Sequence, residues 1–381
     1  MIKLGKKKYA LINGEVLKWA RERTNLTMEE ISLRAKNINI ENIVKWENES
    51  EYPSITEAKI LSDLYDIPFA TLFLSEVPEI SGPKFIDRRT YKDENISISY
   101  ELWKEINRLM GCRQDLIEMV SEDVPKNELN FINNENYVSK TREIFEIKTP
   151  FKNKSQYKDS SYNYFRNLFE KVGIMVLQIE RLTIEQIRGI SLNYEILPII
   201  AVNRSDSDRG KVFTMFHELS HLIRRSSNLC LIDINNEKDD EEKICNEMAA
   251  NILMPESVFK ESIKNIGSIN DSNIGKLADC FAVSRFVILK RLYDLNLINY
   301  NFYMQKYNEY IGQATKIKMN KKKVGFALPD KMFISGYGKL YPSLILKAYY
   351  EGKVSYGEVY KTFGVQSKYL SSIEKAVMLD G

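Results

Sequence analysis

Histidine is nearly absent from this sequence, because only His217 and His221 occur among 381 residues. This scarcity leaves one place where histidine chemistry can occur. Cysteine is also scarce, and no C-x-x-C pair is present among Cys112, Cys230, Cys245 and Cys280. We therefore expect buried, reduced thiols of a cytoplasmic protein rather than a disulfide framework.

Long apolar runs are missing as well. No stretch of about 18 apolar residues occurs, so we expect no membrane-spanning helix and no membrane partner. The N-terminal "MIKLGKKKYALING" is basic but has no apolar stretch behind it, so we expect no secretory signal. The formal net charge of +3 does not by itself call for a nucleic-acid partner.

The residues that are present predict an α+β fold that is mostly helical. A chain of this length predicts two or three domains. Residues 9–75 contain four amphipathic segments, including "LTMEEIS", where Thr27 and Glu30 form a capping box. Short apolar runs, "VGIMVLQI" and "LPIIAVN", predict a small sheet within residues 160–205. Helical patterns return after it, and residues 310–381 carry 12 lysines against 5 acidic residues, a net charge of +7.

The two histidines stand four residues apart in "FTMFHELSHLIRR", with Glu218 between them. On a helix, residues i and i+4 share one face, so both imidazoles can reach one ion. Zinc accepts imidazole nitrogen, and a catalytic zinc keeps one position for water. Glu218 can take the proton of that water as general base and pass it to the leaving amine. The spacing therefore predicts a catalytic Zn²⁺ site, since two random histidines would match it on the order of 1 time in 1,000.

The third ligand must be Asp, Glu or Cys, because no histidine remains. Glu242 on the predicted helix "EEKICNEMAANILMP" is our choice, with Asn246 four residues on as a hydrogen-bond partner of a ligand. From spacing alone, Glu241 and Glu247 are equal candidates. Cys245 is a soft candidate, and we interpret it as a packed thiol in an apolar helix.

These two stretches resemble the ImmA/IrrE family of zinc metallopeptidases, whose pattern is H-E-x-x-H followed by E-x-x-[AC]-N-x-x-A-A-x-x-L-M-P. The resemblance favours Glu242 over the other acids and implies a zincin-like core that cleaves a protein, such as a transcriptional repressor. This sequence departs from the family pattern at Ser220, where the family usually has Gly. The second half of the pattern matches at Glu242, Cys245, Asn246, Ala249, Ala250, Leu253, Met254 and Pro255.

The N-terminal segments "VLKWARERTNLTMEEIS" and "IVKWENESEYPS" resemble the Xre-type helix-turn-helix of phage repressors. The resemblance implies a five-helix domain that binds DNA, with Asn39, Asn42 and Lys45 at base edges. No Gly stands at the turn, and residues 1–80 hold 11 basic against 13 acidic residues, a net charge of −2. A helical domain that binds protein instead is therefore the alternative.

Together these patterns predict four parts: a helix-turn-helix domain (1–78), a helical connection (79–158), the peptidase domain with a trailing helical module (159–300) and a basic helical region (301–381). In the trailing module we expect Leu277, Phe281, Val287, Leu292 and Leu295 to be core residues. The predicted function is a regulatory zinc endopeptidase. The alternative is an antitoxin-like or phage-type regulator that binds DNA and a partner toxin, with the peptidase domain used for docking. The oligomeric state stays open.

Overall fold

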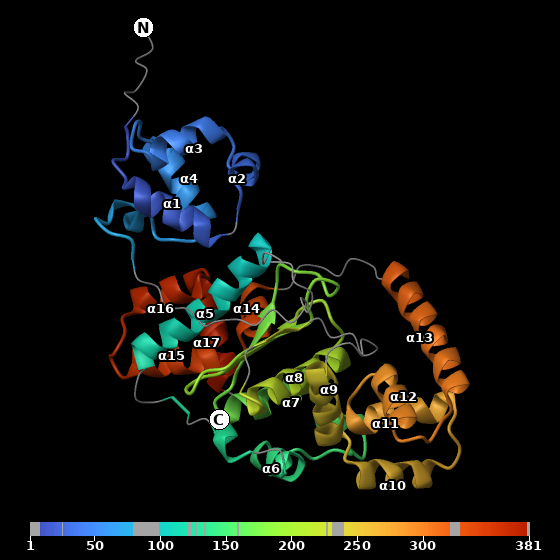
Figure 1. The fold of residues 1–381 in the computed structure, drawn as a ribbon. Coiled ribbons are helices and arrows are strands. Elements are labelled where there is room, and N and C mark those ends of the chain that lie inside the picture. Colours follow the sequence, from blue (N-terminus) through green and yellow to red (C-terminus); the bar gives the residue numbers. More distant parts are fainter. Residues whose placement is uncertain are drawn as a thin grey trace. The chain divides into compact units, whose positions relative to one another are not determined.

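The computed structural model is mostly helical with one small sheet, and it groups into two units (Figure 1). The first unit comprises the N-terminal residues and the start of helix α5 (Tyr100–Val120), up to Arg108, and the second comprises the residues from Leu109 onward. The structure describes residues 8–24, 26–78, 99–120, 124–125, 128–132, 135–157, 160–225, 228–230, 240–320 and 328–378.

The N-terminal unit is a cluster of short helices around an apolar core that includes Leu17, Ile31, Ile43 and Leu61. The predicted capping box is confirmed, since the Thr27 side chain accepts the Glu30 N–H and the Glu30 carboxylate accepts the Thr27 N–H. The element after the fourth α-helix is a 3₁₀ turn rather than a fifth α-helix. The elements are α1 (Gly14–Arg23), α2 (Met28–Arg34), α3 (Ile40–Glu47), α4 (Ile55–Leu64) and η1 (Phe69–Phe73).

The sheet of the second unit has the strand order β1-β3-β2-β4. Strands β1 (Met175–Ile179) and β3 (Ile199–Asn203) pair in parallel, and both lie in the apolar runs that predicted them. Strand β2 (Gly189–Leu192) is antiparallel to β3 and to the three-residue strand β4 (Asn228–Cys230), which the sequence pattern did not indicate. Every residue of β1, β2 and β3 is buried, because helices cover the sheet; this explains the absence of an alternating pattern.

Three helices pack on the sheet or on one another next to it. Helix α8 (Asp208–Ile223) packs on β2 and β3, α7 (Ser161–Lys171) packs on β1 and α8, and α9 (Asp240–Leu253) packs along α8. Helix α9 ends just before Pro255, as predicted. Ala249 of α9 is completely buried, and α9 as a whole packs against α8.

Residues of the trailing module extend this core, and further helices occur elsewhere in the chain. Leu277, Phe281, Val287 and Leu292 are buried, as expected, while Leu295 packs on the core from its edge. The elements are α5 (Tyr100–Val120), η2 (Glu128–Phe131), α6 (Tyr137–Ile144), η3 (Lys154–Tyr157), α10 (Glu256–Ile266), α11 (Asp271–Phe281), α12 (Arg285–Asp294), α13 (Tyr300–Asn320), α14 (Pro329–Tyr337), α15 (Leu340–Tyr350), α16 (Tyr356–Phe363), η4 (Ser367–Tyr369) and α17 (Leu370–Met378). No helix in these described stretches is both long enough and apolar enough to cross a membrane.

A buried ion pair on α7 joins the C-terminal helices to the sheet. Arg166 Nε lies 3.2 Å from Glu170 Oε1, with both side chains nearly fully buried. Glu170 Oε2 accepts the N–H of Lys339 at 2.9 Å, where α15 begins, and Arg166 donates to Ser335 O of α14 at 2.7 Å. Burial raises the pKa of Glu170, and Arg166 and the backbone donors oppose that rise. The pair therefore holds α14 and α15 against α7 and β1.

Removing Glu170 should strongly destabilise the second unit, because Arg166 would then be a buried charge without its partner. We expect Glu170→Ala to lower the free energy of unfolding by about 3–5 kcal/mol, measured by urea denaturation. Glu351→Ala is the matched control, since Glu351 pairs with Lys353 at the surface and should contribute less than about 1 kcal/mol. Equal losses in the two variants would show that the buried pair does not hold these helices.

Candidate metal centre

Helix α8 carries the two histidines and is buried on every side from Lys211 to Ile223. Its first turn is capped by Ser207, whose hydroxyl accepts the N–H of Gly210 at 3.0 Å. A helix that is buried all round holds its side chains between neighbouring elements rather than on a solvent face. His217 and His221 are both completely buried, one turn apart, and directed toward α9.

Glu242 of α9 meets both imidazoles. Its Oε2 lies 3.0 Å from His217 Nε2 and its Oε1 lies 3.4 Å from His221 Nε2, while the two Nε2 atoms are 3.1 Å apart. The three side chains form a group whose ligand atoms all lie within 4.8 Å of one another. Two imidazole nitrogens and one carboxylate oxygen are the donor set of a catalytic zinc, with a fourth position left for water. These residues therefore fit Zn²⁺.

Neither of the two other acids that spacing left open lies between the two histidines, although Glu241 lies near His221. Glu241 receives Arg224 in a two-point pair, with Nε and Nη2 each 2.6 Å from a carboxylate oxygen. Glu247 is exposed on α9. Of the three candidates, only Glu242 lies between the histidines.

Asn246 orients His217, as its position four residues after Glu242 suggested. Its Oδ1 lies 2.9 Å from His217 Nδ1. An amide oxygen can only accept, so this contact places the ring proton on Nδ1. The lone pair of Nε2 is then free to bind a metal.

The electrostatics of the group favour an ionised Glu242. Burial alone would raise the pKa of Glu242, but the contacts with His217 and His221 outweigh it and hold that pKa well below its usual range. Burial lowers the pKa of His221, which keeps this imidazole neutral. At His217 burial lowers the pKa, but the contacts with Glu242 outweigh it and raise that pKa. Metal ligands must be an ionised carboxylate or a neutral imidazole, so a metal at His217 would have to displace a proton.

Glu218, the predicted general base, is fully buried beside Gly189 of β2. A Cβ added at Gly189 would collide with the Glu218 carboxylate and would lie 2.7 Å from the Thr214 methyl group. The Glu218 carboxylate therefore occupies space that a side chain at position 189 would otherwise fill. Nothing in the sequence indicates the role of Gly189, because its proximity to Glu218 arises only from the packing of β2 against α8.

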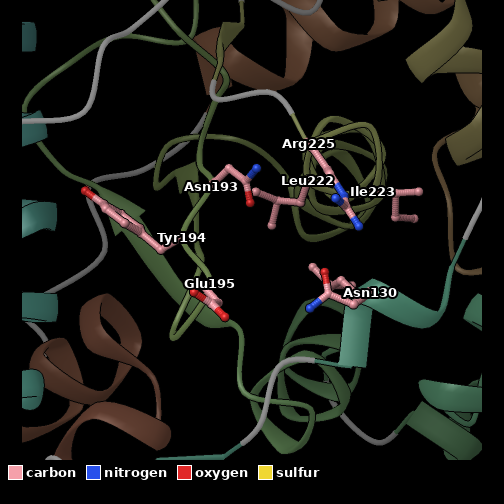
Figure 2. Close-up of a pocket in the computed structure, with 8 residues that line it drawn as sticks. Asn130, Asn193, Tyr194, Glu195, Leu222, Ile223 and Arg225 are labelled. Carbon is pink, nitrogen blue, oxygen red and sulfur yellow. The ribbon is translucent and has the colours of Figure 1, made fainter.

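A cavity of about 310 Å³ borders the C-terminal end of α8 (Figure 2). Leu222 and Ile223, which directly follow His221, form part of its wall. Its polar lining comes from residues on both sides of the cavity, namely Asn130, Asn193, Tyr194, Glu195 and Arg225.

The three residues predicted to contact DNA lie in the other unit, on α3. Asn39 is the N-cap, and its Oδ1 accepts the Asn42 N–H at 2.8 Å. Lys45 Nζ lies 3.0 Å from both Glu41 and Glu51, and hydrogen bonds to these two carboxylates raise the pKa of Lys45. Lys45 is therefore bound to two carboxylates in the structure.

Comparison with known families places the metal centre inside a matched segment. Residues 169–293 match the family model described as Peptidase_M78, IrrE N-terminal-like domain. The match runs from the end of α7 to α12 and supports the ImmA/IrrE family, and with it a metallopeptidase, for this part of the chain. Neither the search of curated proteins nor that of solved structures found a match.

The contact between Gly189 and Glu218 can be tested by a double-mutant cycle. Gly189→Ala should lower the free energy of unfolding by about 1–3 kcal/mol through overpacking. In a Glu218→Ala background the loss should shrink by at least about 0.5 kcal/mol, because the colliding carboxylate is gone. Urea denaturation of the metal-free protein measures both.

Gly312→Ala on α13 is the control, since a Cβ added there meets no atom within 4 Å. It should not destabilise the protein in either background. The account of the Glu218 space is wrong if Gly189→Ala costs the same with and without the carboxylate.

Proposed function

We propose that this chain is a regulatory zinc endopeptidase that cleaves a transcriptional repressor or another regulatory protein. The observation that carries the proposal is the convergence of His217, His221 and Glu242 on one point, with Glu218 on the same helix. The match of residues 169–293 to a peptidase family supports it.

The proposed reaction is hydrolysis of a peptide bond by water. Bound at the two imidazoles and Glu242, zinc supplies a Lewis acid that lowers the pKa of water to about 7 and polarises the scissile carbonyl. Glu218 accepts the proton of the attacking water on a carboxylate oxygen and delivers it to the nitrogen of the leaving amine. Asn246 keeps His217 in the tautomer that binds through Nε2.

The protein substrate is inferred from the family resemblance. The cavity at the C-terminal end of α8 supports it as a candidate binding space for part of a polypeptide, because its wall includes the two residues that follow His221 in the sequence. The mixed lining, with Glu195 and Arg225 both present, suits polar groups of a substrate better than a purely apolar side chain.

DNA binding by the N-terminal unit remains a separate hypothesis. The α2–α3 pair and the exposed N-cap Asn39 support it, whereas the ion pairs of Lys45 with Glu41 and Glu51 oppose it. A phosphate or a base would have to compete with these two carboxylates for Lys45. Titration of labelled duplex DNA with increasing salt decides the point, since phosphate binding must weaken as salt rises.

The alternative function is an antitoxin-like or phage-type regulator that uses the peptidase domain for docking. A docking surface requires no buried carboxylate between two zinc-binding histidines, so the placement of Glu218 favours the peptidase. The two functions differ in one outcome: docking would survive the loss of Glu218.

Substitutions at Glu218 and His221 separate metal binding from catalysis. Glu218→Gln should keep zinc and lose cleavage by at least about 100-fold, because the general base is gone. His221→Ala should lose both. Zinc is measured by metal analysis of the purified protein, and cleavage by co-expression with the products of neighbouring genes.

Glu247→Gln is the matched control, an exposed acid on α9 that should retain zinc and cleavage. Cleavage by Glu218→Gln would contradict the mechanism. If Glu218→Gln still neutralises or represses its partner, docking is the main task.

A further inference from the structure

Cys245 touches the second histidine of the metal centre. Its Sγ lies 3.3 Å from His221 Nδ1, and the thiol is completely buried. This contact is on the opposite side of the ring from Nε2, the atom that faces Glu242. A thiol that only filled space in an apolar helix would not need to meet a ring nitrogen.

The contact between Cys245 and His221 resembles the contact that the next residue, Asn246, makes with His217. Asn246 Oδ1 meets His217 Nδ1 at 2.9 Å, while Cys245 Sγ meets His221 Nδ1. Positions three and four residues after Glu242 lie on the same side of α9 as Glu242 itself. One face of α9 thus presents a carboxylate to both Nε2 atoms and one acceptor to each Nδ1 atom.

A second role for Cys245 has to be weighed, because His221, Glu241 and Cys245 also lie close enough together to hold an ion. Two observations oppose that role. Arg224 occupies both oxygens of Glu241 at 2.6 Å. The Cys245 sulfur meets His221 at Nδ1, whereas the atom of this ring that faces Glu242 is Nε2.

We propose that Cys245 is a positioning residue: its sulfur accepts the Nδ1–H of His221 and so directs the Nε2 lone pair toward the metal. The inference rests on the proposed zinc centre. It assigns to the Cys245–Asn246 pair the task of fixing both imidazoles, one residue to each ring. Cys245 itself does not bind the metal.

The consequence is a dependence of zinc affinity on the chemistry of this side chain and not only on its volume. Cys245→Val fills the same space without an acceptor, so zinc affinity should fall by about 10–100-fold. Cys245→Ser keeps an acceptor and should bind zinc more tightly than Cys245→Val. Since the Ser oxygen is a better acceptor than sulfur but sits on a shorter bond, we expect Cys245→Ser to approach the wild type.

The experiment is a zinc titration of the metal-free full-length protein against a chromophoric chelator. The variants are Cys245→Val, Cys245→Ser, and Cys112→Val as a control for a buried thiol on α5. Thermal unfolding of the metal-free proteins checks that each variant folds. Cobalt(II) is then bound in place of zinc, because a thiolate ligand adds an intense sulfur-to-metal charge-transfer band in the near ultraviolet.

We expect one zinc per wild-type chain, weaker binding in Cys245→Val alone, recovery in Cys245→Ser, and no charge-transfer band. Equal affinity of Cys245→Val and the wild type would overturn the proposal and leave a packed thiol. A charge-transfer band, or a second zinc that disappears in Cys245→Val, would also overturn it and make Cys245 a ligand. Failure of the wild type and Cys112→Val to bind zinc would instead refute the metal centre on which the proposal rests.

Discussion

The packing of α9 along α8 is the constraint on which the site depends. The Nε2 atoms of two buried imidazoles on α8 lie 3.1 Å apart. Burying these polar atoms together is costly unless a negative group or a cation lies between them. Glu242 supplies the negative group from α9, and its contacts with both rings keep it ionised despite burial. The group of metal-binding side chains therefore forms only when α9 packs along α8.

The sheet and the C-terminal helices support this arrangement from the other side. Strand β2 crosses α8 at Gly189, where only a residue without a side chain leaves room for Glu218. Helices α14 and α15 attach to α7 and β1 through Arg166 and Glu170, so the last part of the chain belongs to the core that carries the sheet. The basic composition of the C-terminal region does not indicate this attachment. In the sequence of α7, Arg166 and Glu170 look like ordinary surface residues of an amphipathic helix.

Much of the site could be predicted from the residues themselves. The spacing of His217, Glu218 and His221 is local, so the helix period alone places both imidazoles on one face. The choice of Glu242 required the family resemblance, since Glu241 and Glu247 are equally spaced candidates until the pairing of α8 and α9 is known. Gly189 and the contact of Cys245 could not be predicted, because they depend on which residue of one element faces which residue of another. The three-residue strand β4 is too short to leave a pattern.

The role of Glu242 as the third zinc ligand can be tested by the zinc content of three α9 variants, Glu241→Gln, Glu242→Gln and Glu247→Gln. All three remove one charge from the same helix, but only Glu242 faces both histidines. We expect only Glu242→Gln to lose zinc, and the other two variants to retain one zinc per chain. Full zinc binding by Glu242→Gln, or loss of zinc in Glu241→Gln to the same extent, would contradict this role.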